Sequence, residues 1–305
     1  CGSADYSYDY DDRRCALMSK YFFLALLYII GAPFAGGLLE GIDRKVSARM
    51  QGRKGPSLLQ PFYDLNKLFA KQSVVVNSVQ DFLVCGFLVF VVFTGALFFW
   101  GGDILLVFFA LTLAGIFFIM SACSANAPYS SMGAQRELMQ MMAYEPMVLL
   151  TAIGFYIATG SFSIKEIAQS NVSAIVLLPG FFIGFLYILT IKFRKSPFDI
   201  STSHHAHQEM VRGMTTELSG NILALVTLSH WYENVFLLGV VGLFIINSSW
   251  WSIPAAIVVC LLAFLLETLI DNTFPRVKWQ IMLKWTWIVT LAAGGINLMI
   301  VMLMK

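Results

Sequence analysis

Several ionisable side chains lie inside long apolar stretches of this 305-residue sequence. Glu145 interrupts the apolar stretch 138–159, and His230 and Glu233 interrupt the stretch 218–246. On a helix, His230 and Glu233 would lie on the same face because they are three residues apart. An ionisable group in a membrane span is costly, is expected to face the interior of a helix bundle, and marks a path for protons or ions. The three residues therefore predict a buried proton relay.

Two further acids, Glu267 and Asp271, follow an apolar stretch at a spacing of four residues. On a helix these like charges share a face and repel each other, which favours uptake of a proton by the pair. Groups poised in this way can take up and release protons. We add this pair, and Glu217 at the start of the stretch 218–246, to the predicted relay.

The polar segment 192–217 is predicted to hold the cytoplasmic entrance to this relay. Two acids, Asp199 and Glu209, flank a histidine-rich run made up of His204, His205 and His207. Three histidines could bind a metal ion, but no cysteine or second histidine pair completes a site. Because histidine titrates near neutral pH, a polar relay or docking surface is favoured. The five cysteines show no metal-ligand spacing, so we predict no metal and no cofactor in this chain.

Glu137 is assigned to the same entrance. Glu137, Met141 and Glu145 recur at intervals of four residues and would lie on roughly one side of a helix. This helix would carry Glu137 at its polar end and Glu145 within the membrane.

Arginines are concentrated in the polar segments. Between residues 44 and 56 they are interleaved with glycine and proline. The tendency of cytoplasmic loops to be basic explains the number of charges but not this interleaving. We therefore predict that the arginines dock a soluble partner through charge-assisted hydrogen bonds. The predicted docking residues are Arg44, Arg49, Arg53, Arg136 and Arg276.

The elements that would position these residues are membrane-spanning helices. The sequence is 58% hydrophobic and only 12% charged, about half the charged fraction of a soluble domain. A spanning helix needs about 20 mostly apolar residues, and a spanning segment must satisfy its own backbone hydrogen bonds. The sequence thus predicts an all-α integral membrane protein with about eight transmembrane helices: 21–39, 82–102, 104–127, 138–159, 172–191, 218–246, 250–266 and 285–304.

The segments between these helices predict the orientation. Most of the 20 lysines and arginines fall in the segments 40–81, 128–138, 192–217 and 271–284, which would share one side of the membrane. Basic loops favour the cytoplasm, so these loops are predicted to be cytoplasmic and both termini to lie outside. A short interfacial helix is predicted to start at Pro61, with Phe62, Leu65 and Leu68 on one face.

One membrane domain, 21–305, is expected, preceded by an extracytoplasmic tail, 1–20, without fixed structure. A start at Met18 and a lipid on Cys1 both stay open for this tail. The net charge of +2 comes without a basic patch, so no nucleic-acid partner is predicted.

The order of the polar motifs resembles a known family. The motifs are Glu-x-x-x-Arg from Glu40, Gly-Ala-x-Arg from Gly133, Pro-Phe-Asp from Pro197, Glu-x-Val-x-Gly from Glu209, and Asp-x-x-Phe-Pro-Arg from Asp271. Together they resemble the quinone-site membrane subunit of respiratory complex I and its counterpart in energy-converting nickel–iron hydrogenases. The resemblance covers about residues 20–305. It implies eight spans, with cytoplasmic loops that cup a soluble catalytic arm.

Departures from the complex I pattern favour the Ech-type hydrogenase branch. Asp199 is followed by Ile-Ser-Thr-Ser-His rather than by an acidic run, and Ser229-His230-Trp231 stands in place of Ala-Glu-Tyr. The resemblance then implies a prokaryotic cell membrane and a ferredoxin-linked hydrogenase complex. The implied partners are hydrogenase-like large and small subunits, an iron–sulfur subunit and an antiporter-like membrane subunit. Iron–sulfur clusters and a nickel–iron centre would lie in those partners.

Two alternatives stay open from the sequence. The same scaffold could serve a quinone-reducing, complex I-like oxidoreductase. The chain could also be a stand-alone secondary transporter, although such proteins often show paired repeats and we find no internal repeat.

Overall fold

The computed structural model describes residues 4–72, 77–195, 197–202 and 209–304, with side chains described between residues 19 and 303. His204, His205 and His207 lie outside the described residues. The described chain is helical, and no strand occurs in these ranges. The helices are α1 (Ala4–Met50), α2 (Gln60–Ala70), α3 (Ser78–Trp100), α4 (Ile104–Ser124), α5 (Pro128–Thr159), α6 (Ile164–Ala168), α7 (Ala174–Leu177), α8 (Pro179–Lys192), η1 (Gly213–Thr215), α9 (Gly220–Leu243), α10 (Ser252–Thr273), α11 (Trp279–Val289), η2 (Thr290–Gly295) and α12 (Ile296–Met304).

The predicted all-α membrane fold is confirmed. Within the described residues, seven helices are long and apolar enough to cross a membrane. These helices are Ser19–Met50, Ser78–Trp100, Ile104–Ser124, Pro128–Thr159, Gly220–Leu243, Ser252–Thr273 and Trp279–Leu303.

The remaining predicted span, 172–191, is divided between α7 and α8. Leu178 leaves the helical conformation, with φ −120° and ψ 43°, directly before Pro179. A residue that precedes proline is disfavoured in the helical region, so the helix restarts at the proline. The result is a short helix, α8, that ends with Lys192.

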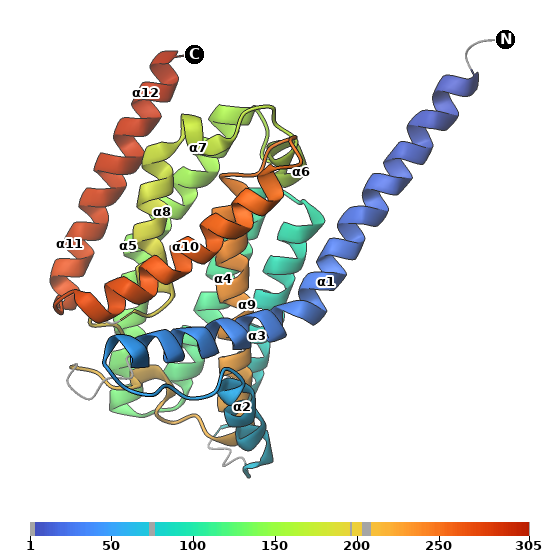
Figure 1. The fold of residues 1–305 in the computed structure, drawn as a ribbon. Helices are drawn as coiled ribbons and strands as arrows, with labels where there is room; N and C mark the ends of the chain where they lie inside the picture. Colours follow the sequence, from blue (N-terminus) through green and yellow to red (C-terminus); the bar gives the residue numbers. More distant parts are fainter. Residues whose placement is uncertain (1–3, 73–76, 196, 203–208, 305) are drawn as a thin grey trace.

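Helix α1 is long and bent. It contains Pro33, which removes one helical hydrogen bond. Figure 1 shows its first part leading away from the bundle and its last part crossing in front of α9. The helix already begins at Ala4, so part of the predicted tail is helical. The placement of that tail relative to the membrane stays a prediction.

Glycines on α1 allow two helices to approach it closely. A Cβ on Gly36 would lie 2.6 Å from the Cβ of Trp231 on α9, and a Cβ on Gly37 would lie 2.5 Å from the ring of Phe62 on α2. Helix α2 confirms the short helix predicted at Pro61, which occupies its first turn.

The core lies between α3, α4, α5, α8 and α9. Large aromatic side chains fill it, and Phe108, Phe118, Phe155, Phe181 and Phe236 are fully buried. Around this core, α10 crosses the bundle obliquely, and α11, η2 and α12 follow one another at its side (Figure 1). The segment η2 is a π-helical turn, where the carbonyl of Ala293 faces the backbone of Gly180 on α8.

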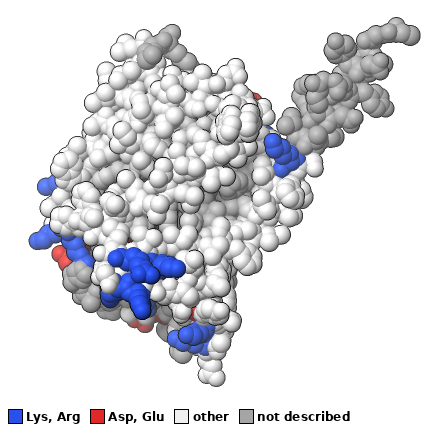
Figure 2. Space-filling view, viewed as in Figure 1, with Lys and Arg blue, Asp and Glu red and all other residues white. Residues whose placement is uncertain are grey.

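Charge is distributed unevenly over the molecule. On the face shown in Figure 2, most lysines and arginines gather toward the end that holds α2 and the C-terminal part of α1, and the broad flank is almost uncharged. Exposed apolar side chains such as Val89, Phe109 and Leu262 belong to the long helices. This arrangement is typical of a membrane protein with its charged loops on one side.

Candidate functional site

Three cations follow one another at the end of α8 and enter the bundle. Lys192 is the last residue of α8, and Arg194 turns the chain with a positive φ of 57°. Lys195 comes directly after this turn. All three side chains contact acidic or histidine side chains on other helices, as described below.

Lys192 forms a buried ion pair with Glu233 of α9. Its Nζ donates to Glu233 Oε1 at 3.1 Å, and both side chains are about nine-tenths buried. The same Nζ lies 4.7 Å from the centre of the Tyr144 ring. Two charges in such a position stabilise each other, because each would be costly alone.

His230 lies one turn before Glu233 and between two other groups. Its Nδ1 is 3.5 Å from Glu233 Oε2, and its Nε2 is 2.6 Å from Nη1 of Arg194. Arginine can only donate, so Nε2 must accept and the neutral ring carries its proton on Nδ1. That proton points toward Glu233. While Arg194 holds this position, His230 has no free site for a second proton.

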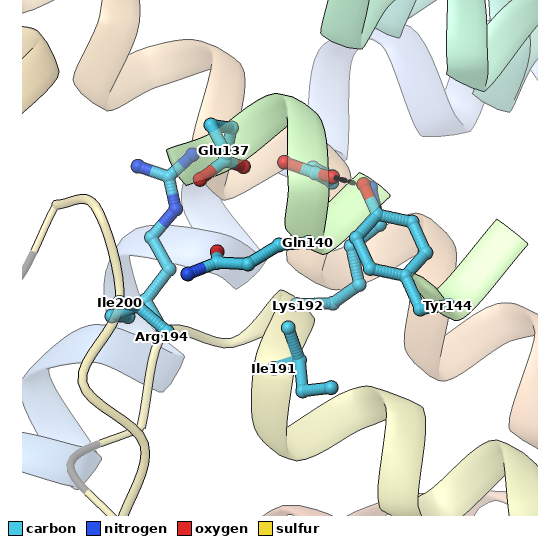
Figure 3. Close-up of a pocket in the computed structure, with 8 residues that line it drawn as sticks. Glu137, Gln140, Tyr144, Ile191, Lys192, Arg194 and Ile200 are labelled. Atoms are coloured by element: carbon cyan, nitrogen blue, oxygen red, sulfur yellow. Dashed lines mark hydrogen bonds and ion pairs between the residues drawn. The ribbon is translucent and has the colours of Figure 1, made fainter. Parts of the chain in front are cut away.

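A small polar pocket connects this cluster with α5. It is lined by Glu137, Gln140, Tyr144, Lys192 and Glu233, among others, and has room for about one water molecule. Figure 3 shows the side chains of Glu137, Gln140 and Tyr144 from α5, with Lys192 and Arg194, around this space. Glu137, Gln140 and Tyr144 lie at intervals of three and four residues and so share one face of α5.

A second pocket of similar size adjoins the first. It shares Glu137, Tyr144, Lys192, Arg194 and Glu233 with it and extends between α3 and α4. A chain of water and side chains across these pockets could carry a proton from Glu137 to Glu233, because water and carboxylates can both accept and donate in turn.

Glu137 is tied to the loop after α8. Its Oε2 accepts a hydrogen bond from Oγ of Ser201. Two residues earlier in that loop, Asp199 contacts Arg136 of α5 at 3.2 Å, and Arg136 also contacts Glu209 at 3.1 Å. Burial raises the pKa of Asp199, Arg136 opposes the shift, and the charge of Glu209 adds to it. The predicted entrance residues Glu137, Asp199 and Glu209 thus lie together.

Lys195 enters a second acidic cluster, between α1 and α10. Its Nζ lies 2.6 Å from Asp43 Oδ1 and 3.9 Å from Asp271 Oδ2. Thr268 donates to the same oxygen of Asp43 at 2.7 Å. Glu267 directly precedes Thr268 on α10 and lies one turn before Asp271. It is fully buried, and neither of its oxygens has a hydrogen-bond partner among the described residues.

The other predicted relay acids lie apart from the pockets. Glu145 and Glu217 are half-buried, and neither belongs to the residues that line the two pockets. A relay role for them stays a prediction.

The five predicted docking arginines differ in exposure. Arg49 and Arg53 are exposed. Arg44 contacts Glu40 and Asp64, and through them joins α1 to α2. Arg136 is mostly buried against the acids described above. Burial lowers the pKa of Arg276, and the charge of Asp199 opposes that shift. Arg44 is also exposed but is held by Glu40 and Asp64, so Arg49 and Arg53 are the best placed to meet a partner.

Sequence reasoning missed the cations that hold the acids. It counted Lys192, Arg194 and Lys195 only as basic loop residues. A signal was present, since three cations within four residues follow an apolar stretch directly. It also missed Glu40, which accepts a hydrogen bond from Nε1 of Trp231. No group of three potential metal ligands occurs in the described part of the chain.

Two known proteins are similar to most of this chain. Hydrogenase-4 component C of Escherichia coli strain K12 is 28% identical over 278 residues, which cover 82% of this chain and 87% of the relative. An NADH-quinone oxidoreductase subunit of Anoxybacillus flavithermus is 28% identical over 322 residues, covering 92% and 91% of the two chains.

A solved structure shares the fold. A chain of the membrane-bound sulfane sulfur reductase, an archaeal respiratory membrane complex, matches with a TM-score of 0.81 and 25% identity. The match covers 92% of this chain and 99% of that one. The three proteins belong to three different enzymes, a hydrogenase, an NADH-quinone oxidoreductase and a sulfane sulfur reductase. Each is one subunit of a larger membrane complex. A profile of the NADH dehydrogenase family matches residues 23–302. This chain is therefore a member of the NADH dehydrogenase family.

Proposed function

We propose that this chain is the membrane anchor and proton- or ion-translocation coupling subunit of a ferredoxin-linked, energy-converting hydrogenase complex. The observation that carries the proposal is the buried Lys192–Glu233–His230 cluster, which meets Glu137 across a water-sized polar pocket. Paired buried charges inside a membrane bundle are costly and mark proton or ion pathways.

The relay begins at the loop after α8. Asp199 and Glu209, with Arg136 between them, form its entrance beside Glu137. A proton passes from Glu137 through water to the Glu233 carboxylate, where it weakens the attraction to Lys192. When Arg194 moves away from Nε2, that nitrogen can take up a proton, and His230 can then pass its Nδ1 proton to Glu233 and remain neutral. Glu145, Glu217, Glu267 and Asp271 extend the proposed relay toward an antiporter-like neighbour.

Electron transfer would take place in partner subunits. In this proposal the large and small hydrogenase-like subunits and an iron–sulfur subunit hold the nickel–iron centre and the clusters. Arg49 and Arg53 meet these partners at the charged end of the molecule, which faces the cytoplasm of a prokaryotic cell. Turnover at that surface changes the charge near Asp199 and so biases the relay.

Two kinds of observation favour the hydrogenase branch. The residues after Asp199 and the run Ser229-His230-Trp231 depart from the complex I pattern. The relatives also include a hydrogenase-4 component. The second candidate is the equivalent membrane chain of a quinone-reducing complex, supported by the relatives that belong to NADH-quinone oxidoreductases.

Purification of the intact complex separates the two candidates. We expect stoichiometric nickel and iron in the complex, none in the separated chain, and hydrogen evolution from reduced ferredoxin. A complex that lacks nickel, carries bound quinone and reduces quinone would contradict the hydrogenase proposal. Metal in the separated chain would contradict the expectation that it holds no cofactor.

A further inference from the structure

The buried acid Glu267 lies outside the pocket of Glu233. It is on α10, fully buried, and neither carboxyl oxygen has a hydrogen-bond partner among the described residues. A carboxylate without a partner is costly in such a position, whereas the neutral acid is tolerated. The charged groups that act on it are Lys195 and Asp271. These surroundings favour the neutral, protonated form of Glu267, so the residue is suited to take up and release a proton.

The cation near Glu267 is Lys195, and its ammonium group contacts an acid of α1 instead of Glu267. Lys195 contacts Asp43 of α1 at 2.6 Å, while Asp271 of α10 is at 3.9 Å. Thr268 of α10 also donates to Asp43. Since Asp43 is the nearest anion, it keeps the lysine charge on the α1 side of the cluster.

We propose that Glu267 is a second proton-loading site and that Lys195 controls its occupancy by moving between Asp43 and the acids of α10. The proposal rests on the proposed coupling function and adds to it a site and a gate. With Lys195 held by Asp43, Glu267 takes a proton. When Lys195 shifts toward α10, its charge favours the Glu267 carboxylate, and the proton leaves to water or to a neighbouring base.

The position of Lys195 links this gate to the first site. Lys192, Arg194 and Lys195 lie within four residues, and the first two contact Glu233 and His230 of α9. A displacement of this segment would therefore alter both sites at once. The groups that face Lys195 come from α1 and α10, namely Asp43, Thr268, Asp271 and Glu267. On α9, Glu233 faces Lys192 and His230 faces Arg194, while Tyr232 donates to the backbone of α1.

Infrared difference spectroscopy of the intact complex tests the gate, since a protonated carboxyl group has its own C=O band. We expect a band that titrates with pH and that Glu267→Gln removes. Lys195→Met should move the midpoint of the band upward by about one pH unit or more, because a cation is lost. Asp43→Asn should move the midpoint downward, because Lys195 is released toward Glu267. Lys284→Met removes an exposed lysine of α11 and should leave the midpoint unchanged.

Two results would overturn the gate: spectra of Glu267→Gln identical to those of the unchanged complex, or midpoints that do not move in opposite directions. If Lys195→Met fails to assemble, the direction of the Asp43→Asn shift decides the question. The spectra do not depend on pumping, so a failure here is distinguishable from a failure of the Glu233 relay. That relay is tested by ion translocation in variants that leave Glu267, Lys195 and Asp43 intact.

Discussion

At the scale of single residues, the Lys192–Glu233 pair is the contact that most constrains the account. Each charge is about nine-tenths buried, and each is acceptable because the other is 3.1 Å away. Removal of one partner from a buried ion pair leaves the other without compensation, whereas replacement of both by apolar or neutral groups is often tolerated.

This predicts different stabilities for a single and a double variant. Glu233→Gln alone should destabilise the protein by about 3–5 kcal/mol, because Lys192 is left buried and unpaired. The double variant Glu233→Gln with Lys192→Met should recover most of this loss. Thermal unfolding of the complex in detergent measures both. Equal melting temperatures for the single variant and the unchanged protein would show that the pair is not the stabilising contact inferred here.

The sequence predicted part of this site. The three-residue spacing of His230 and Glu233 correctly placed them on one helix face. The structure also brings Glu137, Asp199 and Glu209 near one another, while their role as an entrance stays a prediction. The partners Lys192 and Arg194 could not be found in this way, because they lie about 40 residues away in the chain and only helix packing brings them near. Hydrophobic periodicity predicts which residues share one face of a helix, but it does not predict which other helix packs against that face.

At the scale of elements, close helix approach positions the site. Gly36 lies against the backbone of Trp231, so α1 and α9 can meet at the level of His230 and Glu233. The break at Leu178 and Pro179 shortens α8, and the chain then turns at Arg194 to deliver the three cations. If the helix continued without the turn at Arg194, the side chains of Arg194 and Lys195 would not point toward His230 and Asp43.

A pair of glycine variants tests the α1–α9 contact. In Gly36→Ala the new Cβ would be 2.6–2.8 Å from Trp231 atoms, two of them in the backbone, and cannot be accommodated by a side-chain rotation alone. We expect a loss of about 1–3 kcal/mol. Gly31→Ala on the same helix has no atom within 4 Å of the new Cβ and should be neutral. Matching melting temperatures for both variants would contradict the close approach.

Hydropathy predicted the long helices because the membrane imposes both length and apolar composition. It did not predict the division of the segment 172–191 into α7 and α8, although Pro179 gave a local signal for a break. The π-helical turn Thr290–Gly295 was not predicted from the sequence; in the structure the carbonyl of Ala293 in this turn lies against Gly180 of α8.

At the scale of the whole molecule, charge is concentrated at one end and the flank is apolar. Arg49 and Arg53 are exposed at the C-terminal end of α1 and in the turn after it. The side chain of Arg53 forms a hydrogen bond only with nearby Gln51 among its described contacts. An exposed arginine of this kind is available to a carboxylate on a partner.

Charge reversal tests this docking surface. Arg49→Glu or Arg53→Glu should release the soluble subunits and leave the membrane part folded, which co-purification and native gels would show. Glu166→Lys reverses an exposed charge on α6 and should leave assembly unchanged. If both arginine variants assemble normally and keep full activity, the basic segment serves topology alone.

In the proposed function, protons or ions pass through the pocket between Glu137 and Glu233. The most direct measurement is ion translocation by sealed vesicles with a pH-sensitive dye inside, driven by reduced ferredoxin. The assembled double variant Glu233→Gln with Lys192→Met should lose translocation by about tenfold or more, since the replacement at position 233 cannot accept the proton that Glu137 delivers. The conservative variant Glu233→Asp should retain part of it, and Glu166→Gln all of it. Translocation at the unchanged rate by the assembled double variant would contradict the account.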